Sequence, residues 1–212
     1  MKKIFVLLCV TVFALTASAQ VTWNVKAGIG SAWCAIDAPG NNGSSKAHIV
    51  GKLGVGLETP LTENFSLMPS LEFAVKGSKR EYTWNDASLS EKVNLTYIQL
   101  PIMAAYRFNA TDRLNIVAKL GPYFAYALSG KVKDTYIDDY SNDTDDFDIF
   151  EDGEGGKRFD AGLIIGVDFE FNRFVAGLEY ERGFTNLLDF TDDEGSVKIK
   201  NSAIYLTVGY KF

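Results

Sequence analysis

The sequence is poor in the residues on which cross-links and most catalytic sites depend. Its 212 residues include two cysteines, one histidine and five prolines. Cys9 lies in an apolar run at the N-terminus, so Cys34 is the single thiol expected in the processed chain, which excludes an intrachain disulfide. After residue 20 no apolar run reaches the roughly 20 residues that a membrane-spanning helix needs. The net charge of −6 argues against a nucleic-acid partner.

The N-terminus has the pattern of a secretory signal peptide. Two lysines precede an almost wholly apolar run over residues 4–15, and Ala17-Ser-Ala19 follows. These are a basic region, a short hydrophobic region and an Ala-x-Ala cleavage motif. We therefore expect residues 1–19 to be a signal peptide that is cleaved and residues 20–212 to form one domain. Retention of the run as a membrane anchor is the alternative.

Glycine, aromatic residues and alternation with a period of two dominate the rest of the chain. The sequence contains 19 glycines, and 13% of its residues are aromatic. In the last stretch, residues 201–212, every second residue from Ser202 to Phe212 falls on one mainly apolar face of an extended strand, and small or polar residues fall on the other. The same alternation recurs upstream and predicts eight strands, at 21–35, 47–58, 65–75, 95–108, 114–128, 159–171, 174–184 and 201–212.

Long and short connections alternate between these strands. The long connections lie at 37–46, 77–94, 129–157 and 185–200, and the short turns lie at 59–64, 109–112 and 172–173. Long outer loops and short periplasmic turns are typical of outer-membrane barrels. We predict an all-β fold, an eight-stranded antiparallel transmembrane β-barrel preceded by a cleaved signal peptide. An even strand count places both termini in the periplasm and the four long loops outside.

Charged residues within the predicted strands fall on the face opposite the aliphatic one. A soluble sheet would turn this face to water, whereas a barrel in lipid would turn it inward. Aromatic residues near strand ends, abundant glycine on the polar face and mixed signs of charge favour the barrel. Because an eight-stranded barrel is only wide enough for side chains, we expect its interior to be plugged. The residues predicted to point inward are Lys26, Lys52, Glu58, Glu72, Lys76, Arg107, Lys119, Asp168, Glu170, Glu179, Glu181 and Lys211.

Five segments carry a resemblance to a known family. They are residues 97–108 (YIQLPIMAAYRF), 121–124 (GPYF), 159–166 (FDAGLIIG), 178–186 (LEYERGFTN) and 209–212 (GYKF). Together they resemble the small outer-membrane β-barrel family of Bacteroides-like bacteria, often labelled "porin family" or PorT-like. The resemblance implies an outer-membrane location but no particular activity, and it does not place the chain among the secretion-assisting members. Pro101, which matches the family, costs a ladder hydrogen bond, so we expect a bulge or bend near residues 100–102.

No catalytic, cofactor-binding or metal site is predicted. His48 is expected to face inward, and nucleophilic catalysis would require a serine and a carboxylate beside it; we interpret it as part of a polar network. The carboxylate pairs at 168/170 and 179/181 are interpreted as salt-bridge partners of inward lysines and arginines rather than as an acid–base pair. Cys34 is interpreted as a buried free thiol.

The loop over residues 134–154 carries ten acidic residues and no lysine or arginine. It is interpreted as a solvated acidic loop. Binding of a divalent cation is the alternative, although the spacing lacks the glycine of an EF-hand. A further hypothesis is that the basic residues at its base, Lys131, Lys133, Lys157 and Arg158, contact lipopolysaccharide phosphates.

The predicted function is structural, or that of an interaction protein that displays surface loops. A narrow porin-like channel for small solutes is the alternative, and an outer-membrane enzyme is the remote one. The expected partners are outer-membrane lipid and lipopolysaccharide, with no nucleic acid and no cofactor, and the chain is expected to be monomeric.

Overall fold

The computed structural model describes residues 21–38, 41–84, 87–111, 113–137, 142–150, 156–187, 190–192 and 195–212. The predicted signal peptide lies outside these residues. The strands are β1 Thr22–Ala38, β2 Asn41–Ser44, β3 His48–Pro60, β4 Phe65–Trp84, β5 Ala87–Asn109, β6 Leu114–Ile137, β7 Asn142–Asp148, β8 Phe159–Phe171, β9 Phe174–Gly183, β10 Phe190–Asp192 and β11 Gly195–Lys211. None of the described residues forms a helix long and apolar enough to cross a membrane.

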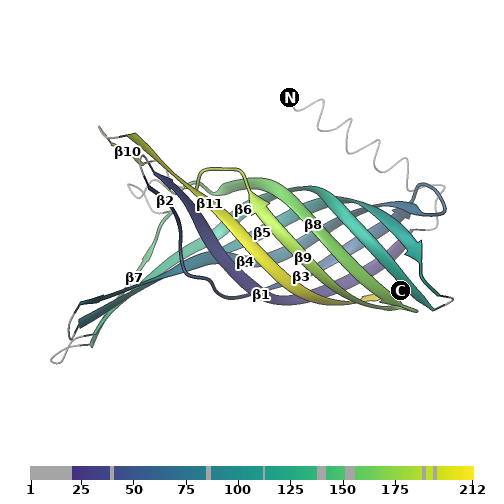
Figure 1. Cartoon of the computed structure of the whole chain (residues 1–212), viewed down its shortest axis with the longest axis horizontal. Coiled ribbons are helices and arrows are strands. Elements are labelled where there is room, and N and C mark those ends of the chain that lie inside the picture. The colour runs from purple at the N-terminus through teal and green to yellow at the C-terminus, as the bar shows by residue number, and fades with distance from the viewer. Residues whose placement is uncertain are drawn as a thin grey trace.

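Eight strands close into a ring of tilted, antiparallel neighbours (Figure 1). The order around the ring is β1, β3, β4, β5, β6, β8, β9 and β11. The terminal strand closes it, because β11 pairs with β1 from Asn24↔Lys211 to Asp37↔Lys198. On its other edge β11 pairs with β9 from Ser202↔Arg182 to Tyr210↔Phe174. The predicted eight-stranded antiparallel barrel is therefore confirmed.

The predicted strands correspond to the eight strands of the ring, but several of those strands run further than expected. β8 covers the predicted residues 159–171, whereas β4 and β5 continue as a pair to Trp84↔Ala87. The prediction of a loop at 77–94 was therefore wrong. The connection after β6 also contains a strand, because β7 folds back along β6. Polar residues outside the ring still pair because backbone hydrogen bonds do not require an apolar face.

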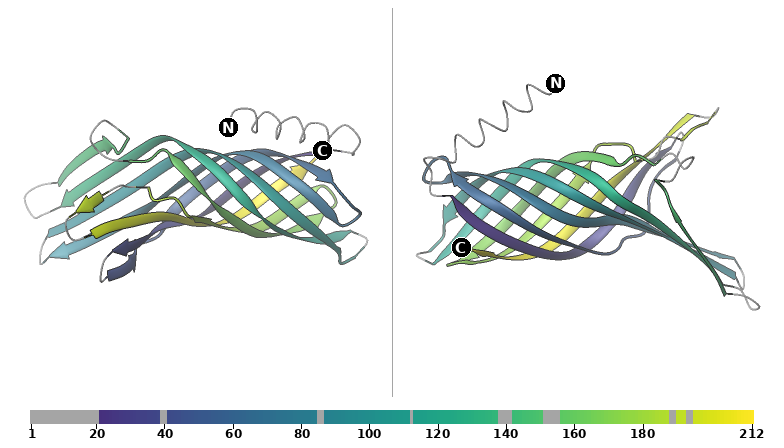
Figure 2. Two further views of the ribbon diagram at one scale, coloured as in Figure 1. Left: turned by 90° about the horizontal axis from the view of Figure 1, so that it is seen from above. Right: turned by 180° about the vertical axis from the view of Figure 1, so that it is seen from behind.

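The two ends of the barrel differ (Figures 1 and 2). At the hairpin end, strands β4 to β7 extend beyond the ring as a sheet, and β2 and β10 add short hairpins. At the turn end lie the short connections near residues 61–64, 110–113 and 172–173, together with the C-terminus. Long and short connections thus occupy opposite ends, as the alternation of their lengths predicted.

The barrel is apolar outside and polar inside. Ile49 is 77% exposed and Leu206 65% exposed, whereas Glu72 and Glu179 are each 1% exposed. Aromatic side chains gather on the outer surface at the turn end, where Tyr210 stacks edge-on against Phe174 and Phe212. This distribution is the reverse of a soluble sheet, and it is the one that the charge pattern predicted.

The irregularity in β5 precedes Pro101. The register with β6 shifts between Thr96 and Tyr97, which leaves Leu128 of β6 as the extra residue of a bulge. Through Pro101 the registers with both neighbours are unchanged, and the ladder to β4 omits residues 100 and 101. The structure therefore has no bulge at 100–102, although both ladders are interrupted there, since the ladder to β6 omits residues 102 and 103. A proline has no N–H to donate, so it can interrupt the pairing of a strand without adding a residue to it.

Candidate functional site

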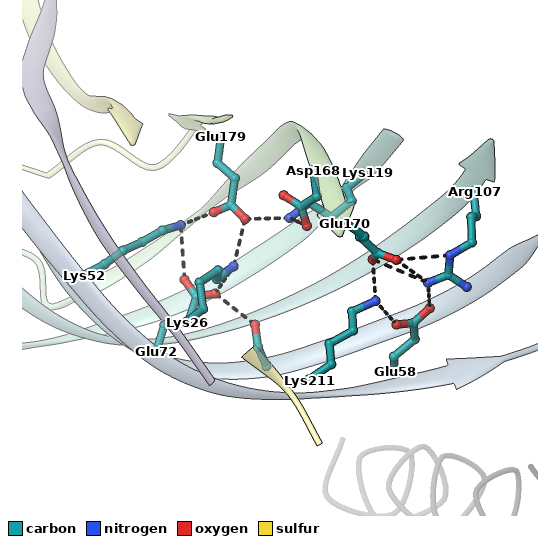
Figure 3. A network of polar contacts seen from close by, with 11 residues as sticks. Lys26, Lys52, Glu58, Glu72, Arg107, Lys119, Asp168, Glu170, Glu179 and Lys211 are labelled. Carbon is teal, nitrogen blue, oxygen red and sulfur yellow. Dashed lines mark hydrogen bonds and ion pairs between the residues drawn. The ribbon is translucent and has the colours of Figure 1, made fainter. Parts of the chain in front are cut away.

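The interior of the ring holds a network of ion pairs, which is the candidate functional site (Figure 3). All twelve residues predicted to point inward take part in it. Period-two alternation explains their convergence, since every second side chain of each strand faces the axis. The network divides into a central cluster and a turn-end cluster.

The central cluster is organised around Glu179 of β9. Lys26 of β1 and Lys119 of β6 each place Nζ 2.8 Å from its Oε1. Lys52 of β3 donates to Oε2 of the same carboxylate. Three cations from three strands therefore meet one buried carboxylate, which ties together strands on opposite sides of the ring.

Further carboxylates of the central cluster alternate with these lysines. Glu72 lies 2.9 Å from Lys26 and 3.4 Å from Lys52. Asp168 lies 2.5 Å from Lys119. Since nearly every charge touches one or more of opposite sign, burial of this many ionised groups is compensated locally.

Glu181 and Lys76 continue the central cluster toward the hairpin end. Lys76 Nζ lies 2.8 Å from Glu181 Oε2, and Lys52 Nζ lies 3.0 Å from Glu181 Oε1. Gln99 donates to the same Oε1 at 3.2 Å. The salt-bridge interpretation of the inward carboxylates is thus confirmed.

Asp160 and the tyrosines around it form the part of the site that sequence reasoning missed. Asp160 is fully buried and accepts from Tyr123 Oη at 3.0 Å and from Asn201 Nδ2 at 3.3 Å. Asn201 also donates to Tyr97 Oη at 3.1 Å. Lys76 Nζ lies 3.8 Å from the centre of the Tyr123 ring, a cation–π contact. Aromatic residues on the polar face of the strands were the available signal.

The turn-end cluster joins the terminal strand to the far side of the ring. Lys211 Nζ lies 2.5 Å from Glu58 Oε2 and also donates to Glu170. Arg107 Nη2 lies 2.6 Å from Glu58 Oε1 and 3.1 Å from Glu170 Oε2. Two cations and two carboxylates from four strands therefore form a closed set beside the C-terminus.

Replacing Lys211 with Met is expected to lower the free energy of unfolding by about 2 kcal/mol, because two charged hydrogen bonds are lost while Arg107 still holds both carboxylates. Urea unfolding of the refolded barrel measures this change. Lys198→Met, in the same strand but exposed, is the control and should change stability little. Equal stability of the Lys211 variant and the native chain would contradict the closed set.

Little space remains between the two clusters. A cavity of about 30 Å³ is lined by residues that include Lys26, Lys119, Asp168, Thr207 and Lys211. That volume holds about one or two water molecules. This cavity leaves little room for a solute beside the ion-paired residues that line it.

His48 and Cys34 lie near the hairpin end. His48 is buried, and Nε2 lies 3.1 Å from Asn94 Oδ1, so its hydrogen-bond partner is an amide rather than the serine and carboxylate of a hydrolase. Cys34 is a buried free thiol, as predicted, with Sγ 3.7 Å from Asn201 Oδ1.

The acidic segment 134–154 is only partly described. Its residues 142–148 form β7, so that part is a paired strand rather than the predicted loop, while 138–141 and 151–155 lie outside the described residues. Within the described part of the chain, no group of three or more His, Cys, Asp or Glu is arranged to hold a metal ion.

Comparison with known proteins identifies the family of this chain. Residues 16–189 match the family model described as "Outer membrane protein beta-barrel domain". The chain belongs to this family. The closing strand β11 lies beyond the matched residues, and its pairing with β1 and β9 completes the barrel. No curated protein sequence matches the chain significantly.

The chain is also similar to several solved structures. Neisserial surface protein A is 11% identical, with 90% of this chain and 97% of that one covered and a TM-score of 0.46. OprG from Pseudomonas aeruginosa is 9% identical, with 92% and 97% covered and a TM-score of 0.45. Ail from Yersinia pestis is 16% identical, with 89% and 98% covered and a TM-score of 0.38.

Membership of the outer-membrane barrel family explains why the outer surface of the ring is apolar. The protein lies in the bacterial outer membrane, and the exposed aliphatic and aromatic side chains of the ring face lipid. The ion-paired residues line the interior of the barrel.

Proposed function

We propose that this outer-membrane barrel is a plugged scaffold with a structural or surface-contact role, displaying its hairpin end outside the cell. The ion-paired interior is the observation that carries the proposal. Glu179 alone connects three strands through three lysines, and the space beside this cluster is about 30 Å³. A hydrated solute would have to break several buried ion pairs to pass.

The orientation is part of the same proposal. Both termini lie in the periplasm once residues 1–19 are cleaved, because the ring has an even number of strands. Basic residues at the hairpin end, including Lys131, Lys133, Lys157 and Arg158, support placing that end in the lipopolysaccharide leaflet. The chain acts as a monomer in this proposal and is a member of the "porin family" or PorT-like branch of Bacteroides-like bacteria, which the five resembling segments support.

Single-channel recording tests the plugged interior. Purified residues 20–212, inserted in a planar bilayer, are expected to give no stable open level above baseline. A wide general porin recorded in the same bilayer provides the positive control. A reproducible open level would contradict the plug and favour the narrow channel for small solutes.

A further inference from the structure

The sheet that extends beyond the ring has two different faces. Val93 of β5 and Val132 of β6 lie opposite each other, and Val132 is 3% exposed. Val93 packs with Ile149 and Phe150 against the cluster that includes Tyr97 and Tyr123 of the barrel interior. The residues that alternate with these valines therefore occupy the face turned away from the interior.

That opposite face carries a row of lysines. Lys79 of β4 pairs with Lys92 of β5, and Lys92 pairs with Lys133 of β6, so the three lie side by side on adjacent strands. Lys131 lies two residues before Lys133 on the same face of β6. Lys92, Lys131 and Lys133 are exposed.

Like charges directly opposite each other destabilise a sheet, and adjacent strands are only about 4.8 Å apart. The Lys92↔Lys133 pair is therefore unfavourable without a counter-ion between the two ammonium groups. Acidic residues flank the row on the same face: Asp146 of β7 pairs with Lys133 on the side away from Lys92, and Glu81 of β4 lies two residues beyond Lys79, diagonal to Lys92. Asp148, opposite Lys131, uses its carboxylate to accept from the backbone N–H of Phe150 at 2.9 Å.

Lys131, the lysine of this row nearest the ring, lies at the height of the headgroup layer, and Lys133 lies two residues further out. On β6 the lipid-facing surface includes Tyr126 and Leu128, which are 52% and 46% exposed. Lys131 follows Leu128 by three residues, which is about 10 Å along a strand and roughly 7–8 Å along the axis of a barrel with ordinary tilt. Headgroups extend about 5–8 Å beyond the hydrocarbon on each side of a bilayer.

We propose that Lys92, Lys131 and Lys133, extended by Lys79, bind the phosphate groups of an outer-leaflet glycolipid. This inference rests on the proposed orientation, with the hairpin end outside. Phosphate suits the site because one dianionic group satisfies two neighbouring ammonium groups, whereas a neutral sugar headgroup leaves their repulsion in place. The binding site is the outer face of the extended sheet, so it does not depend on the interior of the barrel being closed.

Lipid retention measured by native mass spectrometry tests the site. The native barrel is offered diphosphorylated lipid A and the same lipid without its phosphates, and preferential retention of the phosphorylated form is expected. Lys92→Gln/Lys133→Gln is expected to reduce that retention roughly 10- to 30-fold, since each lysine near an anionic surface contributes about 1 kcal/mol. Lys131→Gln alone, a smaller perturbation, is expected to reduce it about 5-fold.

Arg113→Gln/Arg173→Gln is the matched control, because it removes the same charge from exposed positions at the turn end. The control is expected to retain lipid as the native chain does. The inference is overturned if the native barrel does not discriminate the two lipids, or if the control loses as much retention as the lysine variant. The conductance recording is independent, since an open channel would leave lipid retention unchanged.

Discussion

Replacing Glu179 with Gln is expected to lower the free energy of unfolding by about 3–5 kcal/mol, the usual cost of removing one partner from a buried ion pair. The side chain keeps its volume, so the loss is electrostatic. Lys26, Lys52 and Lys119 would then lose the carboxylate that they share and keep only their other acidic partners at the centre of the ring.

Urea unfolding, followed by the mobility difference between folded and heated barrel, measures this change. Glu63→Gln in an exposed turn is the control, because it makes the same substitution outside the network. Lys119→Met combined with Glu179→Gln should cost less than the sum of the single variants, since the two residues are direct partners at 2.8 Å. Additive losses of stability would mean that the contact between Lys119 and Glu179 does not stabilise the fold.

A single methyl group at Gly162 is expected to cost about 3 kcal/mol, because tightly packed interiors tolerate added volume poorly. The new carbon would lie 2.7 Å from Cε1 of Tyr123 and closer still to the backbone oxygen of Arg182. Tyr123 is fully buried and bonded to Asp160, so its ring has little room to move. The strand pairing of β8 with β9 would have to open instead.

Gly51→Ala is the matched control for Gly162→Ala. A methyl group at Gly51 would have its nearest neighbour, Gly28 O, at 3.5 Å, which is ordinary van der Waals contact. Both variants change one strand glycine to alanine, so differences in backbone entropy largely cancel. Equal stabilities of the two variants would show that the ring of Tyr123 does not close over Gly162.

The ring and its inward charges could be predicted because one physical rule governs them. In a lipid-facing strand, apolar and polar residues must alternate with period two. Charged residues such as Lys26, Glu72 and Glu179 can then face only the interior. The identity of the partners could not be predicted. Glu179 meets Lys26, Lys52 and Lys119 from other strands, and the register that brings them together is fixed by pairing across the whole ring.

The parts of the structure that the sequence did not predict do not follow this period-two alternation. Beyond the lipid, strands have no apolar face to mark them, so β7, with Asp143 and Asp145 in a run of acids, reads as a loop although it pairs along β6. Asp160 lies on the buried polar face of β8, and its partners Tyr123 and Asn201 come from other strands. An aromatic residue on a polar face is ambiguous until its neighbour is known.

The bulge at Leu128 shifts by one residue the positions of β6 that face inward and outward. Before it, odd-numbered residues such as Ala125 and Ala127 are buried and Tyr126 is exposed; after it, Val132 is buried and Lys131 and Lys133 are exposed. Deleting this one residue would turn both lysines toward the interior and Val132 outward. A single inserted residue therefore decides whether the lysines of this strand point outward at the lipid surface. In other barrel sequences, a bulge of this kind can be recognised by a shift of one residue in the alternation of apolar and polar positions.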